Sequence, residues 1–209
     1  AIMTTDTFPK IVSKKFLLNS IPVHIWACAK GAGMIHPNLA TLLCFAFTDI
    51  NISKEMLDIA VKNAVNKSFN CISIDGDTST NDTVFVLANG LAGNKKISSC
   101  TDQNYKKFSN MLNETFNELA QMIISDGEGM TKIIKIEVEQ AKTFIDAKKI
   151  AVAIAKSVLV KTAIFGSDPN WGRIIAAIGN SQANFNPEKI DIYVNNFKVA
   201  KNSTAVELN

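Results

Sequence analysis

The chain has 209 residues, of which 47% are hydrophobic and 20% charged, and its formal net charge is +3. This length allows one large domain or two small ones with a sizeable core, and the composition is ordinary for a globular protein. The small net charge, with no run of lysine and arginine, argues against a nucleic-acid partner. No apolar segment approaches the roughly 20 residues that span a bilayer, which argues against a membrane-embedded protein.

The first half of the chain alternates between strand and helix patterns. We expect mixed strands and turns over residues 1–28, ending in a buried strand "VHIWACA", then a loop over residues 30–40 and an apolar strand "TLLCFAFTD". Ser53 is the expected N-cap of a helix that runs to about Phe69. "CISIDGD" alternates as a short strand does, and "TVFVLANG" predicts a strand buried on both faces.

The second half begins with the clearest helix. Thr101 is its expected N-cap and Gly127 its stop, with apolar residues at three- and four-residue steps between them. The remaining expected elements are a half-buried strand "KIIKIEVEQ", a helix from Asp146 to about Leu159, a helix begun by Asp168-Pro169 and closed by Gly179, and a hairpin turning at Asn195-Asn196. Strands and helices interleave throughout, so the predicted class is α/β or α+β with layered sheets.

The four cysteines, Cys28, Cys44, Cys71 and Cys100, lie far apart and form no CxxC pair. We expect reduced thiols, mostly in the core, in a cytosol-like compartment, and neither a disulfide framework nor a zinc site. The chain opens with "AIMTTDTFPK", without an initiator methionine, and we expect no signal or transit peptide within it. We therefore expect a processed or truncated piece of a longer protein.

Two stretches resemble ligand sites without meeting their requirements. Asp75, Asp77 and Asp82 in "DGDTSTND" resemble the start of a calcium loop, but the glycine and the final glutamate of an EF-hand are missing. We favour a turn in which Asp and Thr side chains bind loop amides, and we expect no metal. "KGAGM" is neither a dinucleotide-binding nor a Walker loop, and His24 and His36 have no carboxylate at ligand spacing.

Thr41 is the candidate nucleophile. A threonine hydroxyl needs a nearby base, and the α-amine of an N-terminal threonine, with an ordinary pKa of about 7.7–8.0, can serve as that base. This requires the Ala40-Thr41 bond to break by attack of the Thr41 hydroxyl on the Ala40 carbonyl, an N-to-O acyl shift and hydrolysis. Gly31, Gly33 and Pro37 precede the bond and allow a strained backbone. The plain alternative is that Thr41 is only a β-forming residue at the start of a strand.

Five stretches in order, "AIMTTDTFPK", "KGAGMIHPNLATLL", "SFNCISIDGDTSTNDTVFVLANG", "DGEGMTK" and "VKTAIFGSDPNWGRIIAAIG", resemble the bifunctional ornithine acetyltransferases (glutamate N-acetyltransferases) of arginine biosynthesis. The resemblance implies a layered αββα sandwich of the self-cleaving threonine-nucleophile type. It also implies a cut between Ala40 and Thr41, so that residues 1–40 end an α chain and residues 41–209 begin a β chain. The two chains would pack as one αββα domain, with 131–209 as a candidate smaller lobe.

The same resemblance implies that Thr41 takes an acetyl group from N-acetylornithine and passes it to glutamate in a ping-pong cycle. It assigns substrate binding to Thr4, Lys30, Thr41 and Glu128. Because Thr5 stands next to Thr4, the adjacent threonine is the alternative for the first of these positions. A lysine offers a cation to a carboxylate, and a glutamate offers an anion to an ammonium group. The stretch from Asp168 to Arg173 is read first as a helix cap and structural contact.

The chain departs from the family pattern in composition and in length. Ala32 stands where serine is common and Leu39 where methionine is common. The family's oxyanion-hole Thr-Gly pair and a C-terminal Asn and Thr that bind substrate lie in regions that this sequence lacks, so we expect the chain alone to be weak or inactive.

The alternatives left open are a threonine-nucleophile amidohydrolase or aminopeptidase, and an inactive, non-catalytic fragment. No metal or organic cofactor is expected, and whether acetyl-CoA is also a donor substrate is left open. The resemblance implies small-molecule substrates, α and β chains in a heterotetramer, and neither nucleic acid nor membrane as a partner. The expected compartment is the cytoplasm, or the mitochondrial matrix if the source is eukaryotic.

Overall fold

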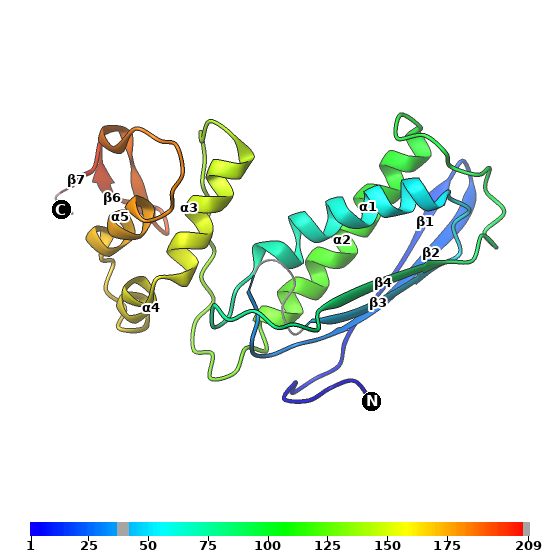
Figure 1. Ribbon diagram of the computed structural model, residues 1–209, viewed down its shortest axis with the longest axis horizontal. Helices are drawn as coiled ribbons and strands as arrows, with labels where there is room; N and C mark the ends of the chain where they lie inside the picture. Colours follow the sequence, from blue (N-terminus) through cyan, green and yellow to red (C-terminus); the bar gives the residue numbers. More distant parts are fainter. Residues whose placement is uncertain (37–41, 207–209) are drawn as a thin grey trace. The chain divides into compact units, whose positions relative to one another are not determined.

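The computed structural model describes residues 1–36 and 42–206. The chain divides into two compact units, Ala1–Met130 and Thr131–Asn209 (Figure 1). Strands and helices alternate along it, so the predicted α/β class is confirmed. Among the described residues, no helix is long and apolar enough to cross a membrane.

Unit 1 is built on a four-stranded sheet in the order β1-β2-β3-β4. The strands are β1 (Lys10–Leu18), β2 (Ile21–Lys30), β3 (Leu43–Thr48) and β4 (Thr83–Ala88). β2 is antiparallel to both β1 and β3, whereas β3 and β4 are parallel. Lys30, the last residue of β2, is paired with Leu43, the first residue of β3. The end of β2 and the start of β3 therefore lie side by side at one end of the strands, and the expected cleavage site falls between them in the sequence.

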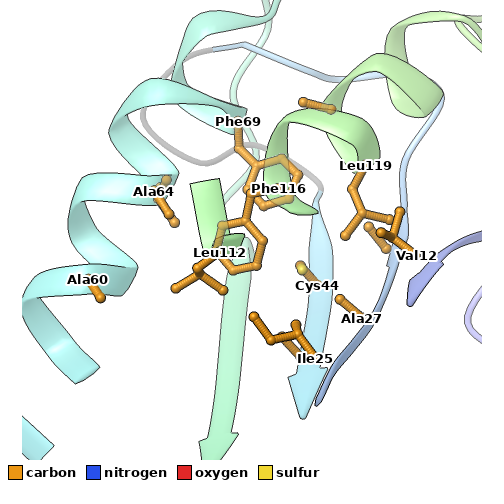
Figure 2. Close-up of a cluster of buried hydrophobic side chains, with 14 of the residues drawn as sticks. Val12, Ile25, Ala27, Cys44, Ala60, Ala64, Phe69, Leu112, Phe116 and Leu119 are labelled. Atoms are coloured by element: carbon orange, nitrogen blue, oxygen red, sulfur yellow. The ribbon is translucent and has the colours of Figure 1, made fainter. Parts of the chain in front are cut away.

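Two helices, α1 (Lys54–Lys67) and α2 (Gln103–Ile124), cover one face of this sheet (Figure 1). Figure 2 shows the core between the helices and the sheet, in which alternate strand residues pack against the apolar faces of the helices. The labelled members are Val12, Ile25, Ala27 and Cys44 from the strands and Ala60, Ala64, Phe69, Leu112, Phe116 and Leu119 from the helical side. The Phe69 and Phe116 rings lie 5.1 Å apart between centroids, in a tilted arrangement.

The other face of the sheet is apolar and exposed. Phe85 and Leu87 of β4 are 52% and 51% exposed, so the prediction that this strand is buried on both faces is wrong for the described part of the chain. Neighbouring strands add further large apolar side chains to the same exposed surface: Ile11, Leu17, Trp26 and Phe47. Trp26 and Phe47 lie 5.9 Å apart and the Phe45 and Phe85 rings stack at 5.7 Å.

The capping predictions were partly right. The Ser53 hydroxyl accepts the Met56 N–H and caps α1, as predicted. α2 is capped by Asp102, whose carboxylate accepts the Asn104 N–H, so the prediction of Thr101 is wrong by one residue. α2 ends at Ile124 with Ser125 as its C-cap, two residues before the expected stop at Gly127.

Two predicted strands are wrong. Residues 69–71 form a 3-10 helix (η1, Phe69–Cys71) and no strand follows over 72–75, because the Ile74 N–H bonds to the Ile35 carbonyl of a loop instead of a sheet neighbour. Residues 131–139 contain no strand either. Their alternation has a different origin: Ile136 and Val138 pack against the core of unit 2 without pairing in a sheet.

Unit 2 packs three helices and a small sheet around its own core. Its elements are α3 (Phe144–Lys156), α4 (Val158–Phe165), α5 (Trp171–Gly179), η2 (Pro187–Lys189), β5 (Ile192–Val194), β6 (Phe197–Lys201) and β7 (Thr204–Ala205). The helix expected up to Leu159 is interrupted at Ser157, whose side chain caps α4. Asn170, not Asp168, caps the last helix, and the hairpin predicted at Asn195-Asn196 is confirmed between β5 and β6.

All four cysteines lie among the described residues, and none is joined to another by a disulfide. The expectation that most of them lie in the core is wrong: only Cys44 is buried, Cys28 is half-buried, and Cys71 and Cys100 are exposed. Burial raises the pKa of the Cys44 thiol well above its ordinary value, which keeps this thiol protonated.

Candidate functional site

Lys30 places a buried cation at the C-terminal end of β2. The residue is 9% exposed, and its ammonium nitrogen lies 3.5 Å from the hydroxyl oxygen of Thr4. It forms no ion pair with any carboxylate that the structure describes. A buried ammonium without a fixed counter-ion is suited to bind the carboxylate of a ligand, because it would gain a strong charge-assisted hydrogen bond.

Glu128 joins this edge from the chain segment that follows α2. Its backbone N–H donates to the Ala32 carbonyl at 2.9 Å. Its carboxylate lies over Gly33: a Cβ added there would be 2.9 Å from the Glu128 Cδ. Glu128 is exposed and its carboxylate has no ion pair with the described lysines and arginine. Lys30 and Glu128 thus lie at the same stretch, residues 30–33. Neither charge is neutralised by an ion pair among the described residues, so each is available to a ligand.

Asp75, the first residue of the stretch "DGDTSTND", holds the loop that follows Lys30 in place. The Asp75 carboxylate accepts the N–H groups of Met34 and Ile35, the latter at 3.1 Å, and also that of Asp77 at 3.1 Å. These bonds occupy both carboxylate oxygens of Asp75 with loop amides. The prediction that aspartates of this stretch bind loop amides is confirmed for Asp75, whereas the strand expected before the turn is not formed.

Ala40 and Thr41, the predicted cleavage site and nucleophile, lie outside the described residues, together with Pro37 and Leu39. The residue after Thr41 is described, and it is firmly bound. The Leu42 N–H donates to Asp82 Oδ1 at 2.5 Å, and the Leu42 carbonyl accepts the Thr83 N–H at 2.9 Å.

Asp82 is a residue whose place in the site the sequence did not reveal. Its second carboxylate oxygen is buried and has no hydrogen-bond partner among residues 1–36 and 42–206. Burial raises the pKa of this carboxyl group, while the Leu42 N–H and the charge of Lys30 oppose the rise. Asp82 therefore binds the N–H of the residue that follows Thr41, and its second oxygen has no partner in the described part of the chain.

A second group missed from the sequence is a buried ionic cluster formed by Asp6, Lys10 and Asp126. The Lys10 ammonium lies 2.6 Å from Asp6 Oδ1 and 2.6 Å from Asp126 Oδ2. Burial alone would raise the pKa of Asp6, but the Gly31 N–H and Lys10 outweigh it, and the pKa is below its ordinary value. The pKa of Asp126 is lowered in the same way, because Lys10 and Thr7 outweigh burial.

The remaining predicted positions are Thr4 and the stretch from Asp168 to Arg173. Thr4, rather than its neighbour Thr5, contacts Lys30. The stretch from Asp168 to Arg173 lies in unit 2, where Arg173 donates to the Leu159 carbonyl at 2.9 Å and to the Thr162 hydroxyl at 3.0 Å. Those contacts hold α5 against α4, so this stretch acts as a structural contact.

Known proteins resemble the whole chain. A family model described as the ArgJ family matches residues 1–209. The glutamate N-acetyltransferase of Methanocaldococcus jannaschii is 54% identical over 200 residues, which are 95% of this chain and 48% of that protein. The mitochondrial arginine biosynthesis bifunctional protein ArgJ of Dictyostelium discoideum is 53% identical over 183 residues, 88% of this chain and 41% of that protein.

A solved structure agrees with these matches. The crystal structure of the arginine biosynthesis bifunctional protein ArgJ of Bacillus halodurans superposes with a TM-score of 0.75 at 42% identity, over 79% of this chain and 77% of that chain. The chain spans about half the length of the curated relatives it matches.

Proposed function

Because this chain belongs to the ArgJ family, we propose that the protein carrying it transfers an acetyl group from N-acetylornithine to glutamate. The printed names of the relatives, a glutamate N-acetyltransferase and bifunctional proteins of arginine biosynthesis, support the reaction class. The observation that carries the proposal for this chain is the pairing of an available buried cation, Lys30, with an available anion, Glu128, beside the same loop.

This pairing suits an amino-acid substrate that carries both charges. The Lys30 ammonium binds the α-carboxylate of N-acetylornithine or glutamate, with Thr4 as a neighbouring hydroxyl. Glu128 binds the side-chain ammonium of N-acetylornithine. Two oppositely charged contacts fix both the position and the orientation of the substrate, as an acyl transfer requires.

The chemical step belongs to Thr41. Attack of its hydroxyl on the Ala40 carbonyl breaks the Ala40-Thr41 amide bond, frees the α-amine and leaves Ala40 bound to the Thr41 oxygen as an ester. Water hydrolyses this ester, which releases the Ala40 carboxylate and restores the hydroxyl, and the free α-amine then acts as the general base. In the first half-reaction the Thr41 oxygen bonds to the acetyl carbon, the amide bond of N-acetylornithine breaks, and the departing nitrogen takes the hydroxyl proton. In the second, the glutamate amine attacks the acetyl ester, forming N-acetylglutamate and returning the proton to Thr41.

The chemistry calls for no metal or organic cofactor, since the hydroxyl and the amine of one residue supply nucleophile and base. Acetyl-CoA would enter only as an alternative acetyl donor. The partners that we propose are the two products of the cut, an α and a β chain, assembled as a heterotetramer. The compartment is the cytoplasm, or the mitochondrial matrix in a eukaryote, in line with the mitochondrial relative from Dictyostelium discoideum.

An isotope-transfer assay tests this proposal. N-acetylornithine with a deuterated acetyl group is incubated with glutamate and the protein that carries this chain, and the products are identified by mass spectrometry. We expect deuterated N-acetylglutamate. Deuterated acetate without transfer would support the amidohydrolase alternative, and the absence of both products would support the inactive fragment.

Lys30→Met supplies the matched test of binding. Loss of a charge-assisted contact of about 1.5–3 kcal/mol raises the KM for both substrates by roughly 10- to 100-fold. Lys14→Met, which removes a partly exposed lysine of β1 whose partner is Glu118, is the control and leaves both KM values unchanged. Equal KM values for the two variants would contradict the role of Lys30.

A further inference from the structure

The ionic cluster of Asp6, Lys10 and Asp126 joins three parts of unit 1 that are distant in the sequence. Asp6 precedes the sheet, Lys10 is the first residue of β1, and Asp126 follows α2. The side chains of Asp6, Lys10 and Asp126 are 0%, 0% and 3% exposed. The Lys10 ammonium also lies 4.9 Å from the centroid of the Phe8 ring.

Each carboxylate of the cluster is connected to a segment that carries a substrate-binding side chain. Asp6 Oδ2 accepts the N–H of Thr4 at 3.3 Å, and Asp6 Oδ1 accepts the N–H of Gly31, the residue after Lys30, at 2.7 Å. Asp126 lies two residues before Glu128 and accepts both the N–H and the hydroxyl of Thr7, the N–H at 2.9 Å. Thr4, Lys30 and Glu128 are thus each within two residues of a group bound to the cluster.

We propose that Asp6, Lys10 and Asp126 are positioning residues, which hold Thr4, Lys30 and Glu128 in the arrangement that binds substrate. This inference rests on the function proposed above and adds to it the residues that set the geometry of the binding side chains. None of the three cluster residues needs to touch the substrate. They act through the backbone at Thr4, at Gly31 and at the end of α2.

The chemistry of the cluster favours this role over simple stabilisation. A buried ion pair is often no more stabilising than an apolar replacement of similar volume, because desolvation offsets the attraction between the charges. What an apolar replacement cannot supply is direction: each carboxylate accepts hydrogen bonds from several donors at fixed angles and so fixes several backbone segments at once.

The test neutralises the whole cluster while keeping its shape. In the protein that carries this chain, Asp6→Asn, Lys10→Met and Asp126→Asn are combined, so that no charge is left buried alone. The matched control is Lys14→Met with Glu118→Gln, which removes a more exposed ion pair that joins β1 to α2. The readouts are kcat, the KM for N-acetylornithine and for glutamate, the extent of the cut at Ala40-Thr41, and the melting temperature.

We expect the triple variant to fold, to be cut as the wild type is, and to show both KM values raised at least tenfold with a smaller change in kcat. The control keeps wild-type values. A folded triple variant with KM values within twofold of the wild type overturns the proposal, and so does a loss confined to kcat. If the triple variant does not fold, the single Asp6→Asn variant decides by the same criterion, and failure of both to fold also overturns it.

The wild-type reaction separates the two proposals. A wild type that transfers acetyl groups, together with a triple variant of unchanged KM, contradicts only the positioning role. A wild type that is cut but transfers nothing contradicts the proposed function, and the positioning role falls with it.

Discussion

At the scale of single residues, Gly33 is where an added methyl group would most directly disturb Glu128, one of the proposed binding residues. A Cβ there would lie 2.9 Å from Glu128 Cδ, so the carboxylate has to move away. We expect Gly33→Ala to raise the KM for N-acetylornithine roughly tenfold, which is about 1.4 kcal/mol, with little loss of stability because Glu128 is exposed and can rotate. Gly179→Ala, where the new Cβ meets nothing within 4 Å, is the control for kinetics and melting. An unchanged KM in Gly33→Ala would argue against Glu128 as a substrate ligand.

Asp82 allows a second prediction at this scale. Its pKa is raised in the folded state, so the folded protein binds this proton more readily than the unfolded chain does. Ionised Asp82 therefore lowers stability at neutral pH, and this loss disappears as the pH falls through the folded pKa. Asn would keep an acceptor for the Leu42 N–H without the charge, whereas Ala would leave that N–H unpaired at about 1–3 kcal/mol.

We therefore expect Asp82→Asn to be at least as stable as the wild type at pH 7 and Asp82→Ala to be less stable. Urea unfolding of the two variants measures the difference. The opposite order of stability would mean that the bond from Leu42 to Asp82 does not determine the effect of the substitution.

Short motifs sufficed to propose Thr4, Lys30 and Glu128 as binding residues, but not to find the residues around them. Thr4, Lys30 and Glu128 stand in distinctive stretches that could be matched to a family. The cluster of Asp6, Lys10 and Asp126 could not be found in this way, because Lys10 and Asp126 are 116 positions apart and only the folded chain brings them together. A lysine at the start of a strand usually indicates a solvated charge, and nothing local distinguishes Lys10 from that case.

At the scale of elements, hydrogen bonding explains which predictions held. The helices α1 and α2 could be predicted because their apolar periodicity is a local signal, as is the serine that caps α1. The strands expected over 71–77 and 132–140 could not be predicted reliably from local signals, since an alternating pattern becomes a strand only when a partner strand is available. Ile74 bonds to a loop carbonyl, and Ile136 and Val138 pack without pairing.

The cap of α1 gives a prediction at this scale. Ser53→Ala removes the acceptor of the Met56 N–H and should destabilise the protein by about 1 kcal/mol. Ser53→Asp retains an acceptor and adds a negative charge at the helix N-terminus, so it should be close to the wild type in stability. Urea unfolding compares the two variants, and equal losses in both would show that the hydroxyl is not the cap that matters.

At the scale of the whole molecule, unit 1 presents an α layer over a β layer whose outer face is apolar and exposed. In an αββα sandwich, the arrangement of the family, that outer face is the one that meets a second sheet. The layers could be predicted from the resemblance, but the exposure of this face could not, because the continuous apolar sequence of β4 reads the same whether its cover lies within the chain or outside it.

The buried cluster should also control the response of the whole protein to acid. The pKa values of Asp6 and Asp126 are below their ordinary value of about 3.9. The stability that these carboxylates contribute is therefore present above about pH 4 and is lost as the pH falls through their folded pKa values, because the unfolded chain takes up protons first. We expect the free energy of unfolding to fall more steeply as the pH drops below about 4 in the wild type than in the variant combining Asp6→Asn, Lys10→Met and Asp126→Asn. Parallel curves would contradict this assignment.

The most direct test of the account is the intact mass of the protein that carries this chain, measured for the wild type and for Thr41→Ala, before and after exposure to N-acetylornithine. We predict that the wild type consists of two chains divided between Ala40 and Thr41, and that the chain beginning at Thr41 gains the mass of one acetyl group on exposure to the donor. Thr41→Ala should remain one unmodified chain. A single uncut chain in both proteins would contradict the threonine mechanism, whatever the family resemblance.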